Sequence, residues 1–187
     1  MRSVLSQFVI LMAMVFMAAA LPARADGNQF AGVLPNGPVL TKNVESMQAA
    51  RYRNLVRQQT DYSCGAASLA TILRYAYGLN VDETTVIEGM MGVADPAVVQ
   101  ERGFSLLDIK RYVETLGMRG RGYRVDEERL GTLRVPGLIL MDVAGFRHFV
   151  VLKRIDDGLV EVGDPILGNR RIPMKEFLEA WPSRAVF

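Results

Sequence analysis

The 187-residue chain contains one cysteine, Cys64, and one histidine, His148. A cysteine thiolate is a strong nucleophile, and an imidazole is the side chain best suited to remove a thiol proton near neutral pH. Together the two residues could carry out nucleophilic acyl transfer, provided that the fold brings them together. A lone cysteine can equally be a small buried side chain without chemistry, and a lone histidine can be a satisfied structural residue.

Cys64 stands where a polar loop gives way to an apolar run with helical spacing. We expect Tyr62 and Ser63 to end the loop and a helix to run from Cys64 to about residue 77, with Gly78 as its cap. The free N–H groups and the dipole at a helix start stabilise an anion, so this position should favour the thiolate. The small neighbours Ser63 and Gly65 leave room for a substrate.

The sequence around His148 predicts a hairpin that ends at an aspartate. His148 opens an apolar strand that runs to Ile155, residues 156–158 (Asp-Asp-Gly) form the turn, and residues 159–162 return toward Asp164. His148 and Asp164 should therefore be neighbours at one rim of the sheet. A carboxylate there can fix the imidazole tautomer and leave the other nitrogen to face the thiol. Considered alone, Asp164 would be a turn residue before a proline.

Two glutamines precede the cysteine, Gln58 by six residues and Gln59 by five. The tetrahedral oxyanion formed in acyl transfer needs hydrogen-bond donors. A glutamine side-chain N–H and the backbone N–H of Cys64 would supply two. The alternative is that both glutamines are ordinary polar loop residues.

Other site classes find little support in the sequence. One cysteine and one histidine fall short of the four ligands of a structural zinc site, and there is no glycine-rich phosphate loop. We therefore expect no metal and no cofactor. Arg119, Arg121 and Arg124 form a small basic cluster, which we interpret as a solvated face and not as a nucleic-acid site.

Residues 1–25 are predicted to be a secretory signal peptide, with Arg2, an apolar run over residues 8–21 and the small-x-small site Ala23-Arg24-Ala25. An uncleaved N-terminal anchor is the alternative. Cleavage would leave 162 residues with 20 basic and 20 acidic side chains. We expect a periplasmic protein with no stable membrane insertion after cleavage. An unpaired thiol is a liability in an oxidising compartment unless it is buried or used.

The remaining pattern predicts an α+β domain over residues 44–187, preceded by a linker or extended arm over residues 26–43. Helices are expected first and an antiparallel sheet after them. The expected helices cover residues 44–53, 64–77, 82–91, 105–116 and 126–133, with a further one from Pro173 and a helical turn at 96–101. The expected strands cover residues 55–56, 120–125, 138–143, 148–155, 159–162 and 170–172.

Three segments in this order resemble the C39 peptidases: Gln58-x5-Cys64-Gly65-Ala66-Ala67-Ser68-Leu69-Ala70, His148-Phe149-Val150-Val151-Leu152 and Gly163-Asp164-Pro165. These are papain-like cysteine proteases, known mostly as bacteriocin-processing domains that cut leader peptides after a double glycine. The resemblance covers roughly residues 55–181. It implies a papain-like fold, with N-terminal helices packed on a C-terminal antiparallel sheet.

By this resemblance, Cys64 would be the nucleophile, His148 the general base and acid, Asp164 the orienting carboxylate and Gln58 the oxyanion donor. Gln59 is less suited to the last role because the family spacing favours Gln58. The best-known members are fused to a transporter. This sequence, with its signal peptide, looks more like the free-standing exported C39-like proteins, some of which are associated with secretion of functional amyloid.

We therefore expect a periplasmic thiol protease that cleaves an exported protein or a leader peptide, in a secretion or functional amyloid pathway. One alternative is a peptide-binding module or export chaperone that uses a papain-like groove without cleavage. Another is an amidase or transpeptidase acting on cell-wall peptides, against which the Gln-x5-Cys-Gly spacing argues.

Overall fold

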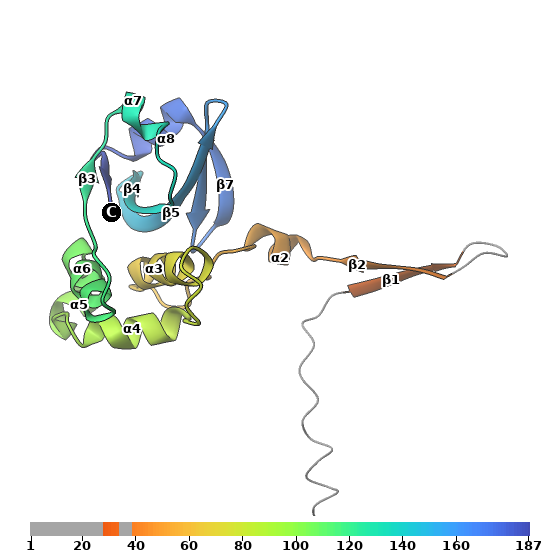
Figure 1. Ribbon diagram of the computed structural model, residues 1–187, viewed down its shortest axis with the longest axis horizontal. Helices are drawn as coiled ribbons and strands as arrows, with labels where there is room; N and C mark the ends of the chain where they lie inside the picture. Colours follow the sequence, from red (N-terminus) through yellow and green to blue (C-terminus); the bar gives the residue numbers. More distant parts are fainter. Residues whose placement is uncertain (1–27, 34–38) are drawn as a thin grey trace, which may run out of the picture. The chain divides into compact units, whose positions relative to one another are not determined.

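The structure is a computed structural model that describes residues 28–33 and 39–187 (Figure 1). The predicted signal peptide lies outside the described residues. The chain divides into two compact units, residues 1–47 and 48–187. In the first unit β1 (Asn28–Val33) pairs antiparallel with β2 (Val39–Val44). We had expected a linker or extended arm here, because neither segment alternates clearly between apolar and polar residues.

Seven helices occur among the described residues, and their capping follows the sequence closely. Asp82 caps α4 by accepting from the Thr85 N–H, and Ser105 and Asp108 form the predicted capping box of α6. The C-cap of α3 is Ala76; Gly78, the expected cap, lies two residues further on with a φ of +71°, which favours glycine. The helices are α2 (Met47–Arg51), α3 (Cys64–Tyr75), α4 (Glu83–Met91), α5 (Pro96–Arg102), α6 (Leu106–Thr115), α7 (Glu127–Leu130) and α8 (Met174–Ala180).

A six-stranded antiparallel sheet has the order β3-β8-β4-β5-β6-β7. The central pair is β4 and β5, in register from Gly137 opposite Leu152 to Val143 opposite Phe146. The bounds are β3 (Tyr123–Arg124), β4 (Gly137–Val143), β5 (Phe146–Asp156), β6 (Leu159–Asp164), β7 (Gly168–Pro173) and β8 (Ala185–Val186). The short strand β8, which lies between β3 and β4, was not predicted, because two residues are too few to show a period.

Three local predictions were wrong. Residues 55–56 form no strand, because the Val56 N–H donates to Thr71 Oγ1 on α3, at 2.9 Å. The strand expected over residues 120–125 is reduced to the two residues of β3. Pro173 lies at the N-cap of α8, one position before the first helical residue.

Strand β5 is buried on both faces, and its alternating side chains enter two cores. Phe149 and Val151 pack with the apolar residues of α3, α4 and α6, whereas Val150 and Leu152 pack with Phe177 and Trp181 of the α8 region. Figure 1 shows α3 to α6 on one side of the sheet and α7 and α8 on the other. This confirms the predicted α+β layout, in which the helix that begins at Cys64 packs against the middle of an antiparallel sheet.

Candidate active site

The start of α3 is docked on β5, directly beside His148. The Ser68 hydroxyl, one turn after Cys64, donates to the carbonyl of Phe149 at 3.1 Å. A Cβ atom added to Gly65 would lie 3.2 Å from the Phe149 ring, so this position needs a very small residue. Through these contacts α3 places Cys64 next to the strand that carries the histidine.

His148 and Asp164 are in contact, as the hairpin predicted. His148 Nε2 lies 2.9 Å from Asp164 Oδ2. The β5–β6 ladder ends with Val151 opposite Gly163, so the two side chains meet diagonally just beyond its last pair. Both are buried, with 5% and 1% of their surface exposed. His148 is the third residue of β5 and not the first, because the strand begins at Phe146.

The Asp164 carboxylate is held by three groups. Its Oδ1 accepts the backbone N–H groups of Ile166, at 2.9 Å, and Leu167, at 3.0 Å, while Oδ2 faces His148. Burial raises the pKa of Asp164, but the hydrogen bonds from His148 and the two amides outweigh it and the pKa lies below its usual range. Asp164 is therefore an ionised acceptor at neutral pH.

An ionised Asp164 fixes the tautomer of His148. Because the carboxylate can only accept, Nε2 carries the proton and Nδ1 keeps its lone pair. Nδ1 is buried and has no hydrogen-bond partner, the Cys64 thiol included. The Phe146 ring, 58% exposed, lies over the imidazole with ring centroids 5.2 Å apart. The orientation of the imidazole thus leaves Nδ1 free to accept a proton, beside an exposed aromatic ring.

The electrostatics of Cys64 differ from the expectation that the thiolate is favoured. Burial raises the pKa of Cys64, and this effect exceeds the lowering by the backbone N–H groups of Phe149, Gly65 and Cys64 itself. The nearby charge of Asp164 raises the pKa further. In the resting structure Cys64 is therefore a neutral thiol surrounded by donors, and it requires a base before it can attack.

Ser63, the N-cap residue of α3, does not cap the helix. Its backbone has φ −98° and ψ 10°, and its side chain accepts no bond from the first turn. The hydroxyl instead contacts the Thr60 carbonyl at 2.8 Å and a carboxylate oxygen of Glu83. The N–H groups at the start of α3 consequently keep no side-chain cap and can receive a substrate oxyanion.

Gln58 lies in the loop before Cys64 with its amide anchored. Its Nε2 donates to the Thr60 carbonyl at 2.5 Å, and its backbone N–H donates to Pro165 at 3.0 Å. The Gln58 Oε1 atom is buried and without a partner. An amide nitrogen carries two hydrogens, so one remains for an oxyanion. The side chain of Gln59 is exposed, and its backbone N–H binds Glu83.

The loop before Cys64 and the turn after Asp164 are joined by several polar contacts. Lys153 Nζ donates to the Asn54 carbonyl at 3.0 Å and to Asn169 Oδ1 at 2.7 Å. Asn169 Nδ2 in turn donates to the Arg53 carbonyl at 2.9 Å, and the Tyr52 hydroxyl donates to the carbonyl of Ile166. These bonds add to the one between Gln58 and Pro165, so the two segments are held in a fixed relation.

Sequence reasoning did not single out Glu83, Phe146 or Ser68. Ser68 could have been found, because it lies one helical turn after Cys64 and so faces the same way. Glu83 looked like an ordinary acidic residue in the first turn of a helix, and Phe146 like a turn residue. Neither has a spacing relative to Cys64 that would indicate its position.

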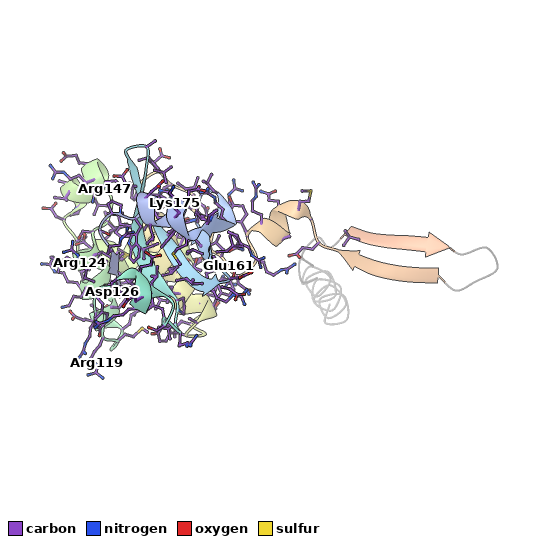
Figure 2. All side chains as sticks on the ribbon, turned by 90° about the horizontal axis from the view of Figure 1, so that it is seen from above. Arg119, Arg124, Asp126, Arg147, Glu161 and Lys175 are labelled. Atoms are coloured by element: carbon purple, nitrogen blue, oxygen red, sulfur yellow. The ribbon has the colours of Figure 1, made fainter. Side chains whose placement is uncertain are left out.

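The described residues contain no group of three or more His, Cys, Asp or Glu side chains placed to hold a metal ion. The basic cluster Arg119, Arg121 and Arg124 is exposed, and Figure 2 shows Arg119 reaching away from the domain. Arg124 Nε contacts the Ser183 carbonyl at 3.4 Å. None of the helices in the described part of the chain is long and apolar enough to cross a bilayer.

The chain is similar to known proteins over most of its length. The model of the peptidase C39 family matches residues 52–187. A protein of Pseudomonas aeruginosa named "Probable functional amyloid protease FapD" is 45% identical over 181 residues, which is 97% of this chain and 76% of that protein. The protein of the same name from Pseudomonas fluorescens is 48% identical over 155 residues, 83% of this chain and 69% of that one.

Two solved structures share the fold. One is a double glycine motif protease from an AMS/PCAT transporter in complex with its leader peptide, with 28% identity and a TM-score of 0.58 over 71% of this chain and 86% of that one. The other, the peptidase domain of Streptococcus ComA, has 23% identity and a TM-score of 0.60 over 71% and 95%. With the family match and the FapD relatives, they show that this chain belongs to the peptidase C39 family and is a cysteine peptidase of papain-like fold.

Proposed function

We propose that Cys64, His148, Asp164 and Gln58 are the catalytic set of this peptidase, and that it acts in the periplasm on a protein secreted through a functional amyloid pathway. One observation carries the assignment of the set. Among the described side chains, two buried polar atoms lack hydrogen-bond partners, and they are His148 Nδ1 and Gln58 Oε1. Buried polar atoms are normally satisfied, so each exception needs an explanation. The free Nδ1 lone pair is what a general base requires, whereas Oε1 belongs to the amide whose Nε2 is the proposed donor. Both atoms belong to residues that the sequence had already placed in the site.

The proposed reaction has two halves, acylation and deacylation, and His148 takes up and returns a proton in each. His148 Nδ1 removes the proton of Cys64, and the thiolate attacks the carbonyl carbon of the scissile peptide bond. The oxyanion is held by the second Nε2 hydrogen of Gln58 and by the N–H of Cys64. The C–N bond then breaks as His148 returns the proton to the leaving amine, which leaves a thioester. Water, deprotonated by the same imidazole, hydrolyses the thioester and restores the thiol.

Asp164 acts through His148. Its two backbone hydrogen bonds fix the carboxylate, and the carboxylate fixes the imidazole with Nδ1 unprotonated. It also stabilises the imidazolium that forms when Nδ1 takes the proton. The neutral resting thiol of Cys64 makes this base essential, since little thiolate is present without it.

The substrate and the compartment are inferred from the relatives and the N-terminus. The two FapD proteins are named as proteases of functional amyloid, and the double glycine motif protease was solved with a leader peptide. The predicted signal peptide supports export. We therefore propose as substrate an extended segment of an amyloid-forming protein or of a partner that is exported with it, met in the periplasm after cleavage of residues 1–25.

The proposal is tested with the purified chain lacking residues 1–25. It is incubated with the amyloid-forming protein of the producing organism and, separately, with a synthetic leader peptide ending in double glycine, and the products are mapped by mass spectrometry. We expect cleavage by the wild type and none by Cys64→Ala or His148→Ala. Cleavage at the same position and rate by Cys64→Ala would end the catalytic assignment. An alkaline phosphatase fusion to residues 1–25 tests export.

A second function, peptide binding without cleavage, is favoured by one observation, the raised pKa of Cys64. A thiol that stays neutral could line a groove without reacting. In that case Cys64→Ala would bind the amyloid-forming protein as tightly as the wild type, and neither would cut it.

A further inference from the structure

Glu83 is a buried acid that the catalytic scheme does not use. It is the first residue of α4, yet only 2% of it is exposed, whereas the neighbouring Asp82 is exposed and caps the helix through Thr85. Glu83 lies among the fully buried side chains of the described structure. Burying a carboxylate is costly unless it is hydrogen-bonded, so its partners indicate what it does.

All the recorded partners of Glu83 lie in the loop that leads to the cysteine. The backbone N–H of Gln59 donates to both oxygens, at 3.0 and 3.1 Å. The Ser63 hydroxyl donates to Oε1. Glu83 therefore binds the loop at two residues. Gln59 directly follows the proposed oxyanion donor, and Ser63 directly precedes the proposed nucleophile.

Between Gln59 and Ser63, the Thr60 carbonyl accepts hydrogen bonds from groups at both ends of the loop. That oxygen receives the Gln58 side-chain N–H at 2.5 Å, the Ser63 backbone N–H at 3.3 Å and the Ser63 hydroxyl at 2.8 Å. The position of the Gln58 amide thus depends on the path of residues 59–63, and Glu83 fixes that path at both ends. A carboxylate on a separate helix sets the shape of the loop.

Glu83 also affects the start of α3. A serine at an N-cap normally accepts from the N–H groups of the first turn. Here the Ser63 side chain is turned toward Glu83 and Thr60, and its oxygen accepts no bond from the helix. The first-turn N–H groups around Cys64 are left for the oxyanion.

We infer that Glu83 is a positioning residue that holds both oxyanion donors, the Gln58 side chain and the N–H at the start of α3, in place for acyl transfer. The inference rests on the proposed catalytic set. It assigns Glu83 no contact with substrate and no proton transfer. Its effect should therefore appear in steps that form a tetrahedral oxyanion and be absent from steps that only use the thiol.

Two reagents separate these steps without the natural substrate. Acetyl-glycylglycine p-nitrophenyl ester acylates a thiol through a tetrahedral oxyanion, whereas iodoacetamide alkylates it by direct displacement at a CH2 carbon. The variants are Glu83→Gln, Gln58→Ala and the double variant. In Glu83→Gln an NH2 group replaces one of the two oxygens that accept from Gln59 and Ser63. Asp82→Ala is the matched control, because it weakens the cap of the same helix without touching the loop.

We expect Glu83→Gln and Gln58→Ala each to slow acylation about tenfold or more, the scale of a lost oxyanion donor, while alkylation changes less than about twofold. The double variant should lose less than the product of the two single losses, since part of the effect of Glu83 acts through Gln58. Asp82→Ala should lower Tm and leave both rates near those of the wild type. If Glu83→Gln does not fold, Ser63→Ala tests the same contact from the other side.

Acylation by Glu83→Gln at the wild-type rate would overturn the inference and leave the catalytic set standing. An equal loss of the acylation and alkylation rates in Glu83→Gln would also overturn the inference, because it would indicate a general distortion of the site. A wild type that is alkylated at Cys64 but never acylated by the ester would overturn the catalytic set and the inference together.

Discussion

His148 Nε2 lies 2.9 Å from Asp164 Oδ2, and the pair is almost completely buried at the end of a hairpin. Sixteen residues separate them along the chain, so the length of the β5–β6 hairpin brings them together. Asp164 is in turn held by two amides of its own turn. The orientation of the imidazole is therefore built into local backbone geometry and does not await a substrate.

Replacing Asp164 by asparagine should reverse the tautomer of His148. The asparagine NH2 group would face Nε2 and stabilise the form with the proton on Nδ1, which cannot act as base. We expect kcat for ester or peptide cleavage to fall by about 10²- to 10⁴-fold, by analogy with serine proteases. The measurement is steady-state kinetics beside a thermal melt. Activity within a few-fold of the wild type, in a folded variant, would contradict the assigned role.

The lowered pKa of Asp164 also predicts an acid dependence of stability. Because the folded-state pKa lies below the unfolded value, ionised Asp164 stabilises the fold above about pH 4. This contribution is lost as the pH falls through the folded-state pKa. The difference in unfolding free energy between wild type and Asp164→Asn, from urea titrations, should be constant from pH 5 to 7 and shrink below pH 4. A difference that does not vary with pH would show that the carboxylate charge contributes nothing.

Alkylation of Cys64 by iodoacetamide should report a neutral resting thiol. Burial holds its pKa above the ordinary range, and no hydrogen bond joins it to His148. The rate should keep rising with pH beyond about pH 8.5. The profile of His148→Ala should be nearly the same as that of the wild type. A plateau reached already near pH 6, and lost in His148→Ala, would instead indicate a preformed thiolate–imidazolium pair.

Lys153 is predicted to be a structural cation. Burial lowers its pKa, and its ammonium group donates to the Asn54 carbonyl and to Asn169 Oδ1 beside the site. Lys153→Met keeps the aliphatic stem and removes both bonds, leaving the acceptors unpaired. We expect a loss of about 1–3 kcal/mol in unfolding free energy. Lys175→Met on the exposed face of α8 is the matched control, within about 0.5 kcal/mol of the wild type. Lys175 is labelled in Figure 2.

Elements with strong local signals were predictable. The capping residues Asp82 and Ser105 and the Asp157-Gly158 turn, with φ of +48° and +71°, fixed three boundaries. The contact between His148 and Asp164 followed from hairpin length alone. The β1–β2 hairpin and β8 were missed because their residues carry no clear period.

The parts of the site that depend on tertiary contacts were not predictable. A helix start was expected to favour the thiolate, but the burial created by packing α3 on β5 has the larger effect on Cys64. Glu83 is buried because α4 turns its first residue toward the 59–63 loop, and no spacing in the chain encodes that approach. The sequence led to the proposed reacting groups. Their electrostatic environment comes from the assembled fold.

The bond from the Gln58 backbone N–H to the Pro165 carbonyl, together with the bonds from the Tyr52 and Asn169 side chains, has a consequence for comparing and engineering these peptidases. These bonds make the loop before Cys64 and the turn after Asp164 one structural unit. A chimera that exchanges only one of them between homologues would inherit mismatched halves. Exchanging residues 52–63 and 164–169 together preserves these contacts.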